Sequence, residues 1–130
     1  MLLAGGTGIT PMFQIASAAL CNPVSTAHFI ILSFSKSDRD ICMHQDLLDL
    51  QARYPTYLTL KFIVSDMTGA LDSVVKGSVR TLPAQQLLQH AAAPVCPSSV
   101  FCTCGPSDFT ATVIALLGQG GVPRDQVLAW

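Results

Sequence analysis

The sequence predicts an α/β fold in which a doubly wound, five-stranded parallel sheet is flanked by helices. The first observation is that strand-like and helix-like runs alternate along the whole chain, and neighbouring parallel strands need such crossover connections. The second is that 50% of the residues are apolar and only 12% are charged, as is typical of strands buried on both faces. The length of 130 residues suits one domain over residues 1–130.

Short apolar runs that stop at polar residues or glycines mark the strands. The first run ends directly at a glycine-rich turn, and the later runs are bounded by polar residues or prolines. The stretch after the third strand contains Gly69 and Gly77 and is expected to be irregular. The strands are therefore expected at residues 1–4, 28–34, 58–65, 99–104 and 126–130.

Apolar residues at helical spacing predict a helix between each pair of strands. Thr10 is a favourable N-cap and Pro11 suits the first helical position, so the first helix is expected to run from there to about Asn22. Leu47 and Leu50 share the apolar face of the second helix. The remaining helices are expected at residues 45–54, 83–92 and 107–117.

Composition excludes several classes of partner. Seven basic and eight acidic side chains give a net charge of −1 without like-charge blocks, which argues against nucleic acid and anionic membrane surfaces. No apolar stretch reaches the roughly 18 residues of a membrane-spanning segment, and no secretory signal is recognisable. An odd number of cysteines, five, indicates reduced thiols and therefore a cytoplasmic location.

The most informative motif is the glycine-rich turn of residues 5–12, GGTGITPM, between the first strand and the first helix. Backbone amides of such a turn can approach a pyrophosphate at a helix N-terminus. A turn that merely needs positive φ is the simpler alternative. Pro11 stands where the usual dinucleotide fingerprint has a third small residue, and no Lys-Ser or Lys-Thr pair closes a Walker-type loop. A standard dehydrogenase and a kinase or ATPase are therefore disfavoured.

Other constellations carry less weight. Tyr57 and Lys61 have the spacing of a helical acid/base pair but fall in a predicted strand, where they would lie roughly 13 Å apart. Cys96, Cys102 and Cys104 lack a second ligand cluster, so no metal site is expected. The three histidines, which lie in separate elements without a Ser-His-Asp arrangement, are His28, His44 and His90.

The GGTGITPM turn, the Cys104-Gly105-Pro106 segment about ninety residues later and the terminal aromatic residue together resemble the ferredoxin-NADP reductase superfamily. The likeness covers nearly the whole chain and is greatest to cytochrome b5 reductases, especially those fused to cytochrome b5. It implies a ferredoxin reductase-like NAD-binding module. In such enzymes NADH reduces FAD, which passes single electrons to a haem protein such as cytochrome b5.

The resemblance also assigns residues. The glycine-rich turn would lie beside the pyrophosphate and nicotinamide. Cys104 would position the nicotinamide without acting as a nucleophile, and Trp130 would lie close to the flavin or, alternatively, fill the core. The cofactor-binding set is then Gly5, Gly6, Thr7, Gly8, Thr10, Pro11, Asp66, Cys104, Gly105, Pro106, Phe109 and Trp130.

Nucleotide preference is expected to depend on Asp66, where cytochrome b5 reductases carry an acidic residue associated with NADH. A carboxylate can accept from a ribose hydroxyl and repel a 2′-phosphate. A solvated turn aspartate is the alternative reading. Lys36 and Arg39 could instead bind a 2′-phosphate, although Asp38 and Asp40 lie beside them.

The flavin-binding barrel of this family, with its Arg-x-Tyr-Ser/Thr signature, does not precede the segment. FAD is therefore expected on a separate domain, supplied in cis or in trans. The expected function is an NADH-binding reductase domain, in full-length context at the cytosolic face of the endoplasmic reticulum. The alternatives are a non-catalytic nucleotide-binding or interaction module and a fold whose site has degenerated.

Overall fold

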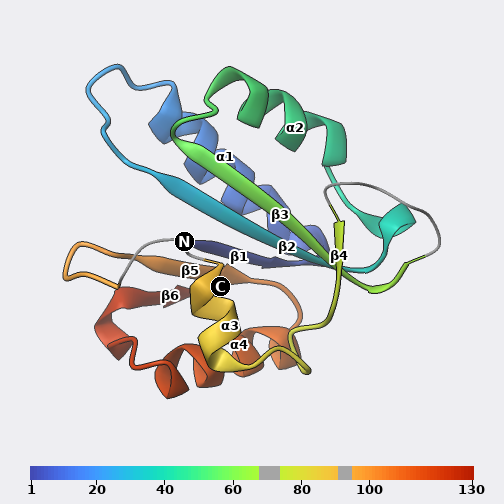
Figure 1. Cartoon of the computed structure of the whole chain (residues 1–130). Coiled ribbons are helices and arrows are strands. Elements are labelled where there is room, and N and C mark those ends of the chain that lie inside the picture. Colours follow the sequence, from blue (N-terminus) through green and yellow to red (C-terminus); the bar gives the residue numbers. More distant parts are fainter. Residues whose placement is uncertain (68–73, 91–94) are drawn as a thin grey trace.

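The computed structural model of the chain describes residues 1–67, 74–90 and 95–130. A single parallel sheet, with strand order β4-β3-β2-β1-β5-β6, runs through the middle of the molecule (Figure 1). Its strands are β1 (Leu2–Gly5), β2 (Phe29–Ser37), β3 (Leu58–Asp66), β4 (Val74–Lys76), β5 (Phe101–Cys104) and β6 (Val127–Ala129). The helices are α1 (Ile9–Leu20), α2 (His44–Arg53), α3 (Ala84–Gln89) and α4 (Ser107–Gln119), with 3-10 turns η1 (Gly6–Gly8), η2 (Asp38–Asp40) and η3 (Arg124–Gln126).

The predicted doubly wound α/β class is confirmed, but the predicted number of five strands is wrong. The sixth strand is β4, which falls in the stretch expected to be irregular and pairs with β3 through Phe62 and Val74. It is only three residues long and lies at the sheet edge. Its existence depends on a partner strand more than ten residues away, so no local periodicity marks it.

Helices cover both faces of the sheet, α1 and α2 on one side and α3 and α4 on the other (Figure 1). Successive side chains of β1 point to opposite faces of the sheet. Leu2 and Ala4 pack in the core under α1, whereas Leu3 packs in the core under α4. Each fully buried side chain of this size contributes about 1.5–3 kcal/mol. β1 therefore contributes to the cores on both faces of the sheet.

Helix boundaries differ from expectation mainly at α1. This helix begins at Ile9 with Gly8 as its N-cap residue, and no side chain caps it. The expectation that Thr10 is the cap is thus wrong; Thr10 is an exposed residue of the first turn. The reason is tertiary, because the chain turns at Gly8 to pass close to the end of β5.

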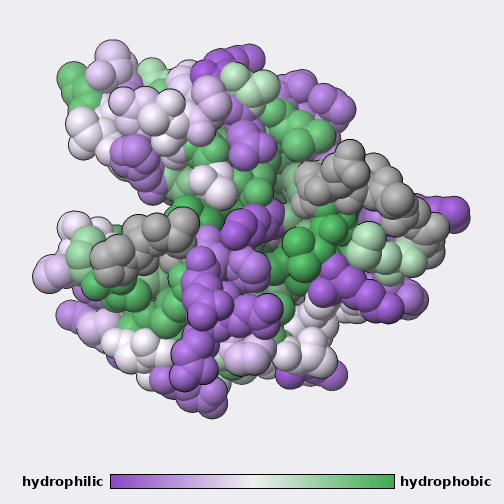
Figure 2. All heavy atoms as spheres, viewed as in Figure 1, coloured by the Kyte–Doolittle hydropathy of each residue, from purple (hydrophilic) through white to green (hydrophobic). Residues whose placement is uncertain are grey.

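The third helix is shorter than expected. Residues 83–92 were predicted to be helical, whereas α3 ends at Gln89, and residues 91 and 92 lie outside the described part of the chain. Figure 2 shows hydrophilic residues over the outward face of α3. The exposed positions there are Gln85, Gln86 and Gln89, while Leu87 is fully buried, so α3 is amphipathic.

Strand order places a topological switch at β1. From β1 the chain moves to β2, β3 and β4 on one side and later returns to add β5 and β6 on the other. In open α/β sheets ligands bind beyond the carboxyl ends of the strands at such a point. The carboxyl ends of β1, β2 and β5 are therefore the place to look for a site.

Candidate functional site

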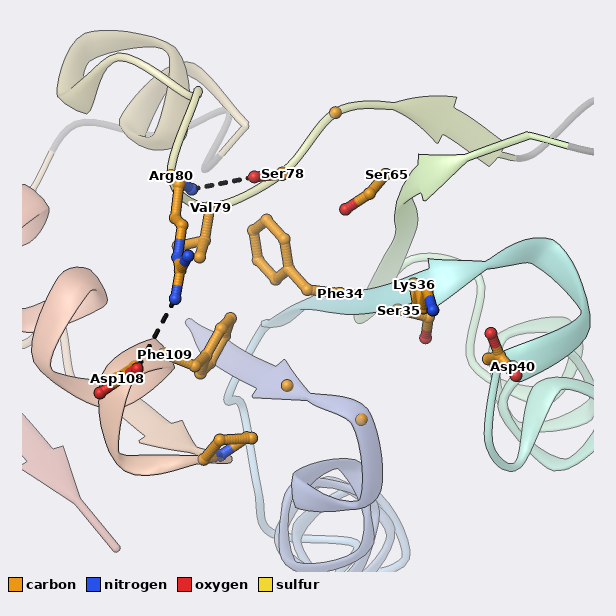
Figure 3. A pocket seen from close by; sticks show the side chains of 14 residues that line it. Phe34, Ser35, Lys36, Asp40, Ser65, Ser78, Val79, Arg80, Asp108 and Phe109 are labelled. Atoms are coloured by element: carbon orange, nitrogen blue, oxygen red, sulfur yellow. Dashed lines mark hydrogen bonds and ion pairs between the residues drawn. The ribbon is translucent and has the colours of Figure 1, made fainter.

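A pocket of about 730 Å³ lies at the carboxyl ends of the strands, within the range typical of small-molecule sites (Figure 3). It draws residues from the ends of β1, β2 and β3, from the segment after β4 and from the start of α4. The lining residues are Gly5, Gly6, Phe34, Ser35, Lys36, Asp40, Ser65, Gly77, Ser78, Val79, Arg80, Pro106, Asp108 and Phe109.

The glycine turn reaches the pocket through Gly6. Its φ of 56° lies in the left-handed region, and a side chain there would meet nothing within 4 Å. Gly6 therefore gives the turn its shape and leaves open space on the pocket side. The turn leads into α1, a helix of 12 residues without a side-chain cap. Its N-terminal amides and the positive end of its dipole can bind an anionic group.

Two other glycines hold the site together by close packing. A Cβ at Gly8 would overlap the carbonyl oxygen of Cys104 and lie 2.8 Å from the Gly105 nitrogen. A Cβ at Gly5 would lie 2.8 Å from Cγ of the Phe109 ring. These contacts dock the start of α1 and the end of β1 directly against the β5–α4 connection.

Aromatic rings form the apolar floor of the pocket. Phe34 and Phe109 lie with ring centroids 5.4 Å apart at 59°, a tilted arrangement favourable for aromatic pairs. Both rings are largely buried in the core under α4. Figure 3 shows them between two sets of charged side chains.

Each of these sets contains one cation and one carboxylate. Lys36 lies at the end of β2 and Asp40 in the following turn η2, and the Asp40 carboxylate accepts a 2.7 Å hydrogen bond from the Ser37 hydroxyl. Arg80, after β4, lies with its guanidinium 3.6 Å from the carboxylate of Asp108 in α4. The pocket thus combines an apolar floor with a mixed-charge rim.

One polar atom at the pocket lacks a partner. The Ser35 hydroxyl is buried and makes no hydrogen bond in the structure. A buried hydroxyl without a partner carries an energetic cost.

A second group of predicted residues lies on the other side of the sheet. Cys104 is half-buried against the core under α1. The Trp130 amide donates a 3.1 Å hydrogen bond to the Thr103 carbonyl, which continues the β5–β6 ladder so that Trp130 lies opposite Cys104. Because neighbours in parallel register point to the same face, the two side chains share that face. Trp130 is 58% exposed, so the alternative that it fills the core is wrong.

The residues predicted to bind the cofactor therefore lie in three kinds of place: in the pocket, on the opposite face of the sheet, and outside both. Gly5, Gly6, Pro106 and Phe109 line the pocket. Cys104 and Trp130 lie on the opposite face. Those outside the pocket lining are Thr7 and Thr10, both exposed, Pro11, which is half-buried, Gly8 and Gly105, which pack the backbone, and Asp66, exposed directly after Ser65.

Several lining residues were not anticipated from the sequence. No motif marks Ser78 and Arg80, which stand one and three residues after Gly77. Their place in the site follows from β4, which was itself missed. The residues missed are Phe34, Ser35, Ser65, Gly77, Ser78, Val79, Arg80 and Asp108.

The constellations set aside in the sequence do not assemble into a site. Lys61 lies in β3, and its Nζ is 3.1 Å from Nδ1 of His90 rather than beside Tyr57. Burial and the positive charge of Lys61 lower the pKa of His90. In residues 1–67, 74–90 and 95–130, no three His, Cys, Asp or Glu side chains are grouped so that they could hold a metal ion. Nor does any helix of these segments have the length and apolarity to cross a membrane.

The fold and the pocket define a doubly wound α/β domain with a pocket at its topological switch, where domains of this class bind their ligands. A family model described as "Oxidoreductase NAD-binding domain" matches residues 2–114, and the chain belongs to this family.

Among curated proteins, the chain is 31% identical over 125 residues to NADH-cytochrome b5 reductase 2-A of Vanderwaltozyma polyspora. It is 33% identical over 126 residues to NADH-cytochrome b5 reductase 2 of Candida glabrata. Each match covers 96% of this chain but only 40% of the relative. The chain therefore spans less than half the length of these relatives.

Solved structures agree with this placement. The cytochrome b5 reductase domain of Ulva prolifera nitrate reductase superimposes with a TM-score of 0.86 at 21% identity, covering 99% of this chain and 47% of that one, which shows the shared fold. The CS-b5R domains of human Ncb5or, solved in an NAD+ form, give a TM-score of 0.82 at 25% identity over 98% of this chain and 35% of that one.

Proposed function

We propose that the chain is the NADH-binding domain of a flavin-dependent reductase of the cytochrome b5 reductase type. The observation that carries the proposal is the position of the pocket, which places Gly6 and the uncapped α1 N-terminus at the switch point of an oxidoreductase NAD-binding domain. Two of the named relatives are NADH-cytochrome b5 reductases, which supports this choice of enzyme.

The residues present fit a pyridine dinucleotide. Gly6 leaves open space where a side chain would stand, and the turn leads into the N-terminus of α1, which no side chain caps. The adenosine and its phosphates would occupy the pocket over Phe34 and Phe109. The nicotinamide would lie on the opposite face beside Cys104 and Trp130, so that the dinucleotide passes across the carboxyl end of β1.

When bound, NADH supplies a hydride to FAD held by a partner domain, in cis or in trans, and a haem protein such as cytochrome b5 receives the electrons. The residues of this chain bind and orient. Cys104 and the ring of Trp130, which is exposed, would flank the nicotinamide and hold it at reacting distance, an orientation effect that accelerates such transfers. None of the residues assigned to the cofactor acts as a nucleophile in this proposal.

A reducing, cytoplasmic location is part of the proposal. All five cysteines are unpaired in the structure, in keeping with an environment in which thiols stay reduced.

The NADH preference is assigned to Asp66. This residue is exposed at the end of β3, next in the chain to Ser65, which lines the pocket, and the proposal assigns its carboxylate to the adenosine ribose. A 2′-phosphate there would meet a like charge. At a solvated site such repulsion corresponds to roughly a three- to tenfold weaker affinity for NADPH.

Calorimetric titration of the chain with NADH and NADPH tests both parts of the proposal. We expect saturable binding that favours NADH, and Asp66→Ala should raise the NADPH affinity relative to NADH. Asp125→Ala, which removes an exposed carboxylate outside the pocket, is the matched control and should leave the ratio unchanged. An unchanged ratio in Asp66→Ala would refute the assignment of preference.

The catalytic part needs a second measurement. With a flavin-binding reductase domain supplied in trans, NADH-dependent reduction of a dye should appear only when both domains are present. Nucleotide binding without any such activity would favour the non-catalytic module instead.

A further inference from the structure

Arg80 and Asp108 face each other at the pocket rim. Arg80 follows β4, whereas Asp108 stands in the first turn of α4, so the pair joins two separate segments (Figure 3). The guanidinium lies 3.6 Å from the carboxylate, and both residues line the pocket. The backbone N–H of Arg80 takes no part in this contact; it donates a 3.1 Å hydrogen bond to the Ser78 hydroxyl oxygen, which holds the loop in place.

This ion pair is easily exchanged. The side chains are 73% and 82% exposed, and water screens pairs of that kind strongly. The separation of 3.6 Å is also longer than a good charge-assisted hydrogen bond. A phosphate, with more charge and several acceptor oxygens, matches the planar guanidinium fork better than one distant carboxylate oxygen does.

The same pocket has a second place for phosphate on its Gly6 side. The open Gly6 turn and the N-terminus of α1 favour an anion there, and Gly6 and Arg80 line one continuous cavity. A diphosphate seated at the turn would therefore share the pocket with the Arg80 guanidinium. The Asp108 carboxylate, in contrast, would repel it.

We propose that Arg80 binds the diphosphate of the pyridine nucleotide, and that Asp108 is the partner it leaves when the nucleotide enters. This inference rests on the proposed function. It adds Arg80 to the residues that bind the nucleotide, and it states that Arg80 exchanges Asp108 for the diphosphate. Arg80 acts as a binding residue, and Asp108 lowers the affinity by competing for it.

The test is calorimetric titration of Arg80→Gln and Asp108→Asn with NADH and NADPH, alongside the unmodified chain. Arg80→Gln should weaken both nucleotides roughly tenfold and leave their ratio unchanged, because the diphosphate is common to both. Asp108→Asn should strengthen both about threefold, because Arg80 is then free and the repulsion is gone. Arg53→Gln, which removes an exposed arginine of α2 outside the pocket, should change neither. Thermal unfolding of each variant checks that the fold is retained.

Each other outcome overturns part of the inference. Full affinity in Arg80→Gln would show that Arg80 does not bind the nucleotide. A loss confined to NADPH would assign Arg80 to the 2′-phosphate instead. Weaker binding in Asp108→Asn would mean that the ion pair only supports the loop. If the unmodified chain bound neither nucleotide, the proposed function itself would fail.

Discussion

Replacing Gly8 with alanine tests whether the contact between α1 and β5 holds the site together. Gly8 has a φ of −62° and a ψ of −6°, an ordinary helical conformation, so alanine would suffer no backbone strain. Its methyl group would instead overlap the Cys104 carbonyl oxygen and approach the Gly105 nitrogen to 2.8 Å. Both are backbone atoms, which cannot rotate away as the end of a flexible side chain can. The helix and the strand must therefore separate.

The expected cost is about 3 kcal/mol, the upper end of the usual cost of overpacking. For a domain of this size, with a shift of about 3–5 °C per kcal/mol, the melting temperature should fall by about 10 °C. Calorimetry or circular dichroism would measure it. NADH affinity should fall as well, because the carboxyl end of β1 moves relative to α4.

Two matched substitutions isolate the cause. Gly118 lies within α4 with nothing within 4 Å of its Cβ position, so Gly118→Ala should stabilise the chain by about 0.5 kcal/mol through helix propensity. Gly6→Ala also meets nothing within 4 Å but retains a φ of 56°, and should cost about 1–2 kcal/mol. A melting temperature for Gly8→Ala within 2 °C of the unmodified chain would refute the reasoning.

Two further predictions concern Phe109 and Cys96. Phe109→Ala should lower the free energy of unfolding by about 3–5 kcal/mol, because the ring packs on Phe34 and on Gly5, while Phe109→Leu should cost less than about 1.5 kcal/mol; equal losses in urea denaturation would contradict this. Hydrogen bonds from the Ser98 and Ser99 hydroxyls lower the pKa of the exposed Cys96 thiol to about 7, so its alkylation rate should rise as the pH increases through 7 and level off above it. Replacing Ser98 with alanine should move that midpoint to higher pH, and an unmoved midpoint would show that the hydroxyl does not stabilise the thiolate.

Sequence patterns predicted the layered architecture well because hydrophobic periodicity reports burial directly. β2 and β3 were found close to their true positions, since β2 begins with an apolar run and β3 alternates before it becomes apolar. β4 could not be found this way, because three residues at a sheet edge are defined by pairing with Phe62 to Val64 rather than by their own pattern. The start of α1 was misplaced for a similar reason, since the favourable cap at Thr10 gave way to close packing at Gly8.

The residues of the candidate site likewise differ in how far the sequence could predict them. Gly6 and Phe109 were predicted because they belong to compact motifs whose residues are near one another in sequence. Arg80 and Asp108 meet only because β4 and α4 converge from different parts of the chain. Such contacts form only in the folded chain, and they cannot be predicted from the local pattern of a single sequence.

The central position of β1 has a consequence for synthesis. Leu3 pairs with Leu32 on one side and with Thr103 on the other, so the second neighbour of the strand is translated about 100 residues later. At roughly 5–20 residues per second, the ribosome needs about 5–20 seconds to supply it. During that interval the edge of β1 that later pairs with β5 has no partner, because β5 and β6 have not yet been synthesised. The nascent chain therefore passes through a stage in which an apolar strand edge is open to other chains.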